Sequence, residues 1–136
     1  MLKKYLKPLP LPAPADWGVL LLRVGMSLLM MQYGYAKLHN YLSGERGFAD
    51  PIGIGEEASL VLTIFAEFFC SILLILGLAA RLALIPLITT MLVAALIIHA
   101  QDPFDKQEHP ILFLIPYLTL LLTGPGRYSL DKVLFG

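Results

Sequence analysis

Hydrophobic residues along the chain gather in four long segments that are separated by polar connections. The segments cover residues 17–38, 58–80, 82–100 and 111–122. About 20 apolar residues span the ~30 Å hydrocarbon core of a bilayer, so the first three segments predict transmembrane helices. Pro116 interrupts the fourth, but a helix that begins near Asp105 and turns Glu108 toward the protein reaches the same length. The pattern therefore predicts an all-α integral membrane bundle of four transmembrane helices.

The two ends of the chain differ from these segments. Residues 1–16 combine three lysines with a proline at every second position from Pro8 to Pro14. Alternating prolines cannot form a helix, so this basic arm is predicted to be extended and semi-rigid. Residues 17–136 then form a single transmembrane domain. A Gly-Pro-Gly run ends its fourth segment, and Ser129 is placed to cap a short final turn at the membrane interface.

The distribution of Lys and Arg predicts the orientation, because cytoplasmic connections carry the excess of these residues. With four spans, the side that holds both termini has Lys3, Lys4, Lys7, Arg81, Arg127 and Lys132. The opposite side has Lys37, Arg46 and Lys106. This bias predicts that both termini, and with them the basic arm, lie in the cytoplasm. The opposite face is acidic.

Composition agrees with a membrane protein and excludes several other classes. Of the 136 residues, 57% are hydrophobic and 15% are charged, against roughly 25% charged in soluble domains. Ten Lys and Arg balance ten Asp and Glu, which leaves no basic excess for nucleic-acid binding. The single cysteine excludes an internal disulfide, a CxxC redox pair and a cysteine-rich metal site.

Polar and small residues recur at helical spacing on the first two segments. On the first segment they occupy positions 23, 27, 30, 34 and 37, and on the second positions 59, 63, 67, 70 and 77. The other faces are largely Leu, Ile, Val and Phe. Small residues let helices approach closely, so the two stripes are predicted to face each other or an internal cavity.

Arg23 and Glu67 are the most informative residues of these stripes. A charge at membrane depth costs at least ~2.5–3.5 kcal/mol, so such groups normally pair, and we expect Arg23 to pair with Glu67. Asp131 is the alternative partner of Arg23, and it could instead pair with Arg127 four residues earlier. The charged pair has two interpretations: a site for a polar headgroup or a proton, or a structural pair that sets helix register.

Lys37 and Tyr33, on the first segment, complete the candidate ligand-binding set with Arg23 and Glu67. In the predicted topology, three histidines lie near the end of the bundle that holds Lys37: His39, His99 and His109. Their spacings match no compact zinc motif, so ordinary polar anchoring is favoured over metal binding, and no metal is predicted.

Several motifs resemble the DoxX family of small four-helix membrane proteins. The strongest match is the run from Gly124 to Asp131, which resembles the family's GPG-x-x-SLD ending. The others are Arg23-Val24-Gly25, Gly34-x-x-Lys37-Leu38, and Glu67 followed by Gly77-Leu78 and Arg81. The resemblance covers about residues 17–132. It implies a four-helix bundle in the bacterial cytoplasmic (inner) membrane.

The resemblance also implies a link to redox chemistry. Family members are linked to a subunit of thiosulfate:quinone oxidoreductase, to resistance against quinones and thiol stress, and to a membrane complex with superoxide dismutase and a sulfurtransferase. The positions of interest that it carries over are Arg23, Lys37, Glu67, Arg127 and Asp131, the last two as a motif at the cytoplasmic mouth of the bundle. No catalytic role attaches to any of them.

Two functions from different classes follow. The first is a redox-linked subunit that binds a quinone or a similar lipophilic molecule in the bundle core, while a partner protein or bound cofactor carries the electrons. Such a chain would at most be an accessory subunit of an oxidoreductase. The second is a non-enzymatic scaffold that anchors soluble redox or stress-response partners. A solute transporter is less favoured, because four helices enclose little volume unless the protein oligomerises.

Overall fold

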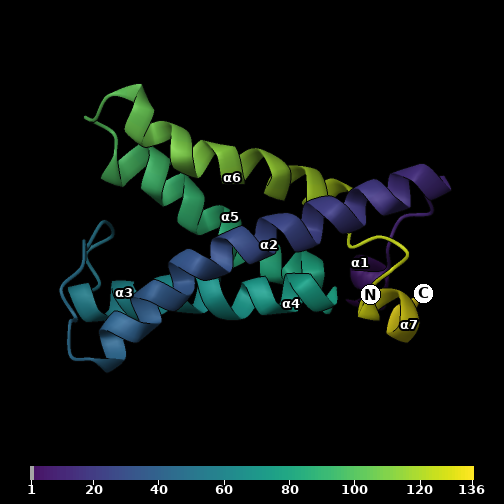
Figure 1. The fold of residues 1–136 in the computed structure, drawn as a ribbon, viewed down its shortest axis with the longest axis horizontal. Helices are drawn as coiled ribbons and strands as arrows, with labels where there is room; N and C mark the ends of the chain where they lie inside the picture. Colours follow the sequence, from purple (N-terminus) through teal and green to yellow (C-terminus); the bar gives the residue numbers. More distant parts are fainter. Residues whose placement is uncertain (1) are drawn as a thin grey trace.

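The computed structural model describes residues 2–136, and this part of the chain is helical with no strand (Figure 1). The first long helix is α2 (Ala13–Leu42). The second is continuous and consists of α3 (Glu56–Ile64), the π-helical turn η1 (Phe65–Phe69) and α4 (Cys70–Leu76), and the third consists of α5 (Ala80–Val93) and the π-helical turn η2 (Ala94–Ile98). The fourth is α6 (Phe104–Thr123). The short helices are α1 (Leu2–Leu6) and α7 (Leu130–Phe135).

Three of the long helices have the length and apolar composition to cross a membrane. They are Ala13–Leu42, Glu56–Leu76 and Ala80–Ile98. These confirm the first three predicted segments, although the first helix extends four residues further in each direction. The fourth long helix, α6, begins at Phe104, one residue before the predicted start. It is not among the three because its first two turns are polar and charged.

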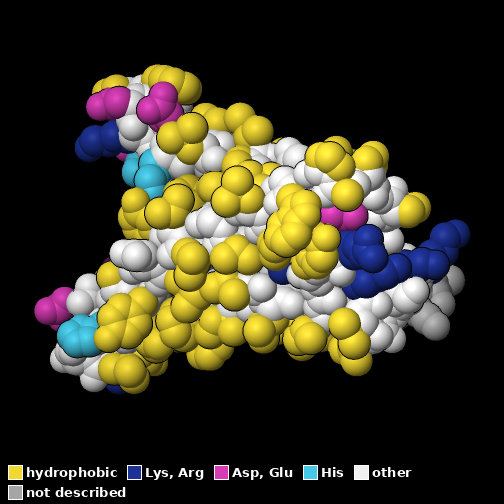
Figure 2. Space-filling view, turned by 45° about the vertical axis from the view of Figure 1, so that its right-hand side comes forward, with side chains coloured by type: hydrophobic (Ala, Val, Ile, Leu, Met, Phe, Trp, Pro, Cys, Tyr) yellow, Lys and Arg dark blue, Asp and Glu magenta, His cyan; other side chains and the backbone are white. Residues whose placement is uncertain are grey.

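The helices form two packed pairs that meet at one end and separate at the other. The first helix, α2, packs along η1 and α4, while α5 packs along α6 (Figure 1). The core between them is apolar, with Met30, Leu74, Leu84 and Tyr117 at or near zero exposure. Where α3 begins and α5 ends, the pairs diverge, and this end of the molecule is notched (Figure 2).

The two predicted polar stripes lie in the interior, as expected. On α2, the buried positions include Arg23, Ser27, Met30 and Gly34, with Lys37 half-buried. On the second long helix, Ser59, Glu67, Cys70 and Gly77 are buried and Thr63 is half-buried. The stripes follow the helical repeat because a helix in an apolar medium places its polar groups where protein can satisfy them.

The N-terminal arm is not a free strut, and its prediction as extended is correct only for residues 7–12. Residues 2–6 form α1, and α2 already begins at Ala13. Arg81 holds the arm against the bundle: its Nη1 donates to the carbonyls of Tyr5 at 2.8 Å and Lys7 at 2.9 Å. The connection predicted around Arg81 is instead residues 77–79, and Arg81 lies in the first turn of α5.

Gly34 is a position at which α2 closely approaches the backbone of η1, and it generates a stability prediction. A methyl group at Gly34 would lie 2.7 Å from the backbone carbon of Glu67, so Gly34→Ala has to push the two helices apart. We expect it to lower the free energy of unfolding by about 1–3 kcal/mol, the usual range for overpacking. Thermal unfolding in detergent measures this.

Gly25 supplies the matched control on the same helix. No atom lies within 4 Å of the position that a methyl group would take at Gly25. Gly25→Ala should therefore leave the unfolding temperature unchanged or raise it slightly, since alanine favours the helix by roughly 0.5–1 kcal/mol. Equal effects of the two substitutions would contradict a close approach at Gly34.

Candidate functional site

Arg23 does not pair with Glu67, and this sequence-based expectation is wrong. The guanidinium instead donates to main-chain carbonyls: Nη1 to Pro125, and Nη2 to Tyr128 at 2.9 Å and to Ile75 at 3.4 Å. Arg23 is only 2% exposed. A guanidinium has five N–H donors in a fixed plane, so three carbonyls bind its two terminal nitrogens without a carboxylate, while Nε has no hydrogen-bond partner.

Asp131 is the second buried charge at this end, and it binds the start of α5. Its two carboxylate oxygens accept the backbone N–H groups of Ala79 at 2.7 Å and Ala80 at 3.0 Å, while its own N–H donates to the carbonyl of Gly77 at 2.9 Å. Within residues 2–136 it forms no ion pair with Arg23 or Arg127, the partners considered from sequence. It acts as a cap supplied from far along the chain.

Arg23, Asp131 and the loop 124–129 together form what we call the terminal clasp. Ser129 caps α7 as expected, since its hydroxyl accepts the N–H of Lys132. The hydroxyl also donates to the carbonyl of Gly126 at 2.7 Å, which fixes the loop. The clasp ties α2, the α4–α5 connection and the end of the chain to one another, and every hydrogen bond named here is structural.

Glu67 pairs with Lys37 at the opposite end of the stripes. Lys37 Nζ lies 2.5 Å from Glu67 Oε1, and the exposed fractions of the two side chains are 29% and 6%. The pair forms because Gly34, one turn before Lys37, lets α2 lie against the backbone of η1. The structure therefore brings together two candidate residues, Lys37 from the stripe on α2 and Glu67 from the stripe on the second long helix. Arg23 is held apart from them in the terminal clasp.

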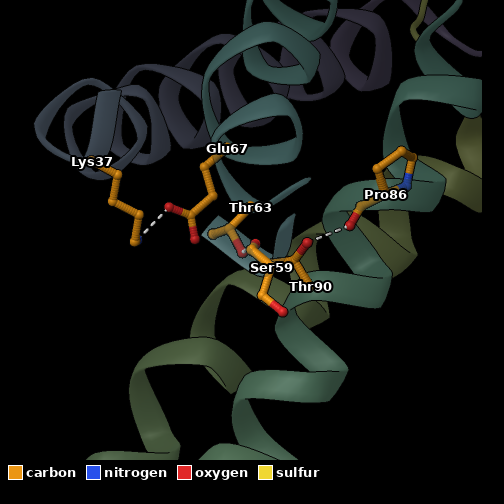
Figure 3. Close-up of polar contacts among 6 residues, drawn as sticks. All are labelled: Lys37, Ser59, Thr63, Glu67, Pro86 and Thr90. Atoms are coloured by element: carbon orange, nitrogen blue, oxygen red, sulfur yellow. Dashed lines mark hydrogen bonds and ion pairs between the residues drawn. The ribbon is translucent and has the colours of Figure 1, made fainter. Parts of the chain in front are cut away.

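The ion pair lies in the wall of a cavity of about 360 Å³. Figure 3 shows Lys37 and Glu67 on one side, with Ser59 and Thr63 of α3 and Thr90 of α5 nearby. The Thr63 and Thr90 hydroxyls each donate to a carbonyl of their own helix at 2.8 Å, which leaves their oxygens able to accept. The polar residues of the wall are Lys37, Ser59, Thr63, Glu67, Thr89, Thr90, His99 and His109. The remaining wall is apolar.

Both π-helical turns contribute to this cavity. Glu67 belongs to η1, and Ala94 and Ile98 belong to η2 on the facing helix. Such turns are rare, and they occur frequently at functional sites. Their placement on two separate helices, both beside the same cavity, marks this end of the bundle as the candidate site.

The loop between α2 and α3 covers one side of the cavity. Asp50 holds the loop in place: its carboxylate accepts the N–H groups of Ile54 and Gly55 at 3.0 Å and the hydroxyl of Ser59 at 3.1 Å. The loop residues Phe48, Ala49, Pro51, Ile52 and Ile54 form its apolar wall. Sequence analysis missed this role, although a Gly-rich polar loop of this length is a signal for a functional segment.

Of Tyr33 and the three histidines, only His99 and His109 line the cavity. Tyr33 is outside the wall, 44% exposed, with its ring edge-on to that of His109 at 4.7 Å between centroids. His99 lies 2.7 Å from a carboxylate oxygen of Asp102, and His39 is exposed. Residues 2–136 contain no group of three or more His, Cys, Asp or Glu arranged to hold a metal.

Comparison with known proteins gives the chain a family. The family model described as DoxX matches residues 18–100. The chain belongs to the DoxX family. The matched region of this DoxX protein contains Arg23, Lys37 and Glu67, whereas Asp131 and the rest of the C-terminal motif lie beyond it.

One curated relative of this DoxX protein is the inner membrane protein YqjF of Escherichia coli (strain K12). The two are 27% identical over 125 residues, which cover 88% of this chain and 93% of the relative. No solved structure matches the chain significantly. With three apolar helices of spanning length, these comparisons identify a multi-pass protein of the bacterial inner membrane in contact with the lipid bilayer.

The terminal clasp of this DoxX protein predicts that replacing one carboxylate oxygen of Asp131 lowers the stability of the fold. Asp131→Asn keeps the size of the side chain but replaces one acceptor oxygen by an NH₂ donor that faces the N–H of Ala79 or Ala80. We expect the free energy of unfolding to fall by about 1–3 kcal/mol, because a buried donor loses its partner. Thermal unfolding in detergent is the measurement, with Asp105→Asn on the exposed first turn of α6 as control. Equal melting temperatures for both variants would contradict a structural role for Asp131.

Proposed function

We propose that this DoxX protein binds a quinone, or a similar lipophilic molecule with hydrogen-bonding oxygens, in the cavity beside Lys37 and Glu67. The observation that carries the proposal is a partly buried ion pair in the wall of an otherwise largely apolar cavity of about 360 Å³. Ligand sites typically combine an apolar lining with a few polar groups and have volumes of roughly 300–1,000 Å³. The cavity matches the headgroup of such a molecule, and its tail would continue between the helices into lipid.

The two charged groups have complementary chemistry toward a quinone. Lys37 has three N–H donors, of which Glu67 uses one, so it can donate to a carbonyl oxygen of the oxidised ring. Glu67 can accept the O–H of the reduced form and hold its proton. Thr63 and Thr90 offer further acceptors around the same space. In this proposal Lys37, Thr63 and Thr90 bind and orient the ring, and the Glu67 carboxylate is the group that would hold a proton.

Electron transfer would belong to the quinone and to a partner, since none of these side chains is an electron carrier. We therefore propose an accessory role beside a membrane or soluble redox protein and assign no catalytic residue. The second candidate is a non-enzymatic scaffold for such a partner. It is favoured by α7, whose apolar Val133 and Leu134 are 77% and 58% exposed at the end that holds both termini.

We further propose that α6 is a fourth span and that both termini face the cytoplasm. Support comes from the length of α6, 20 residues, and from its packing along α5. Figure 2 shows most Lys and Arg side chains at the end that holds the termini, and acidic and histidine side chains at the other. Under the positive-inside rule, this charge distribution supports a cavity on the side away from the cytoplasm.

The ligand proposal is tested by removing both charges at once. Lys37→Met with Glu67→Gln leaves no unpaired buried charge, so the protein should remain folded and abundant. We expect its affinity for decylubiquinone, measured by calorimetry in detergent, to fall about tenfold or more, as for loss of a hydrogen bond to a charged group.

The control removes an exposed pair of the same kind. Arg46 Nη1 lies 3.4 Å from Glu57 Oε1, and the two side chains are 52% and 57% exposed. Arg46→Gln with Glu57→Gln should leave the affinity unchanged. A Lys37 and Glu67 double variant with normal abundance and normal affinity would reduce that pair to architecture and favour the scaffold.

Topology is tested by labelling single cysteines from either side of the membrane. Ser43→Cys and Lys106→Cys should react with an impermeant maleimide in intact spheroplasts, whereas Lys132→Cys should react only after the membrane is opened. Cys70 is buried and should stay unlabelled throughout. Labelling of residues 106 and 132 from the same side would show that α6 does not cross.

A further inference from the structure

A second recess lies at the end of the molecule away from the cavity. It has a volume of about 450 Å³ and is bounded by residues 7–11 of the arm on one side and by the C-terminal segment on the other. Three basic side chains line it: Lys7, Arg127 and Lys132. The proposed quinone site uses none of them, and Arg127 and Lys132 lie outside the region that the family model matches.

These three cations are exposed and form no ion pair within residues 2–136. Figure 2 shows the basic side chains gathered at this end of the molecule, next to apolar surface. The one acidic residue of the recess is Asp16, which is 4% exposed and accepts the backbone N–H of Arg127 at 3.3 Å. Three basic side chains therefore stand against one carboxylate, so the side chains that line the recess carry a net positive charge.

The arm that forms one wall of the recess is packed into the fold, because α1 at its start contacts both α5 and α7. Arg81 donates to carbonyls of the arm and, through Nε, to the carbonyl of Leu121 at 3.1 Å near the end of α6. Leu6 and Pro8 of the arm are buried. The backbone of the arm is thus held beside the C-terminal segment, and the residues that carry the three cations lie around one recess.

Aromatic and apolar residues place the recess at the depth of lipid headgroups. Trp17 stacks on Tyr128 with 4.5 Å between ring centroids, and the two side chains are 58% and 38% exposed. Exposed Trp and Tyr pairs of this kind are typical of the membrane interface. Leu9, in the wall of the recess, is 47% exposed and offers a surface for acyl chains.

We propose that this recess binds the phosphate group of an anionic phospholipid. Arg127 can hold two phosphate oxygens with its planar guanidinium, and Lys7 and Lys132 neutralise the remaining charge from either side. A zwitterionic lipid binds more weakly, because its own cation is repelled by three basic side chains. The bound lipid joins the arm to the C-terminal segment from the outside, over the terminal clasp.

The experiment compares two double variants that lose the same charges at opposite ends. Arg127→Gln with Lys132→Gln removes two cations of the recess, and Arg46→Gln with Lys106→Gln removes one Arg and one Lys from the other end. Binding of phosphatidylglycerol and phosphatidylcholine to the full chain is titrated by native mass spectrometry in detergent. We expect phosphatidylglycerol affinity to fall roughly 30-fold in the first variant only, as for two basic residues near an anionic group.

Each other outcome overturns the proposal. An equal loss in both variants means that only the net charge matters. Equal affinity of the unchanged protein for the two lipids means that the recess does not select anionic lipid. Binding of glycerol 3-phosphate that is as tight as that of phosphatidylglycerol makes it a site for a soluble phosphate instead.

A second variant tests the proposal if the recess double variant is unfolded. If the recess double variant does not fold, Lys7→Gln replaces it, since Lys7 lies in the non-helical part of the arm with its side chain exposed. Lys4→Gln, exposed on α1, is its match. Lys7→Gln should weaken phosphatidylglycerol binding roughly fivefold and Lys4→Gln should not. No difference between them overturns the proposal.

Discussion

The need to surround a buried guanidinium with acceptors determines how this bundle is closed. Arg23 is inside an apolar medium, where an unpaired charge is costly, and the acceptors it finds are carbonyls at the end of α4 and in the loop 124–129. These hydrogen bonds hold the C-terminal segment against the bundle, where the Asp131 carboxylate accepts the N–H groups of Ala79 and Ala80 at the start of α5. It also leaves Glu67 free to pair with Lys37, so the geometry of one end of the molecule sets the chemistry available at the other.

The cavity end is built by different means from the clasp end. Close packing at Gly34 fixes the ion pair, the π-helical turns η1 and η2 reshape the two facing helices, and the Asp50 loop covers the side. At the clasp end, main-chain groups bind both terminal nitrogens of Arg23 and both carboxylate oxygens of Asp131, whereas the cavity end has polar side chains with unused hydrogen-bonding capacity. This contrast is what separates a structural charge, Arg23, from charges that are available to a ligand.

Sequence patterns predicted the helices and their buried faces because both depend on length and on the spacing of polar residues along one helix. They also predicted the Ser129 cap, a local signal. The partner of Arg23 could not be predicted, since the carbonyls that bind it belong to no particular residue type. The π-helical turns, and the closure of the cavity by the Asp50 loop, depend on packing between segments far apart in sequence, which spacing within a helix does not report.

The terminal clasp has a consequence for the order in which the protein is made. Arg23 enters the membrane early in synthesis, but its carbonyl partners Ile75 and Pro125 follow 52 and 102 residues later. A nascent chain that lacks the residues of the clasp therefore exposes the Arg23 guanidinium and the unpaired N–H groups at the start of α5 to the bilayer, where both are costly. Synthesis of residues 124–131, rather than insertion of any single helix, supplies the groups that complete this packing.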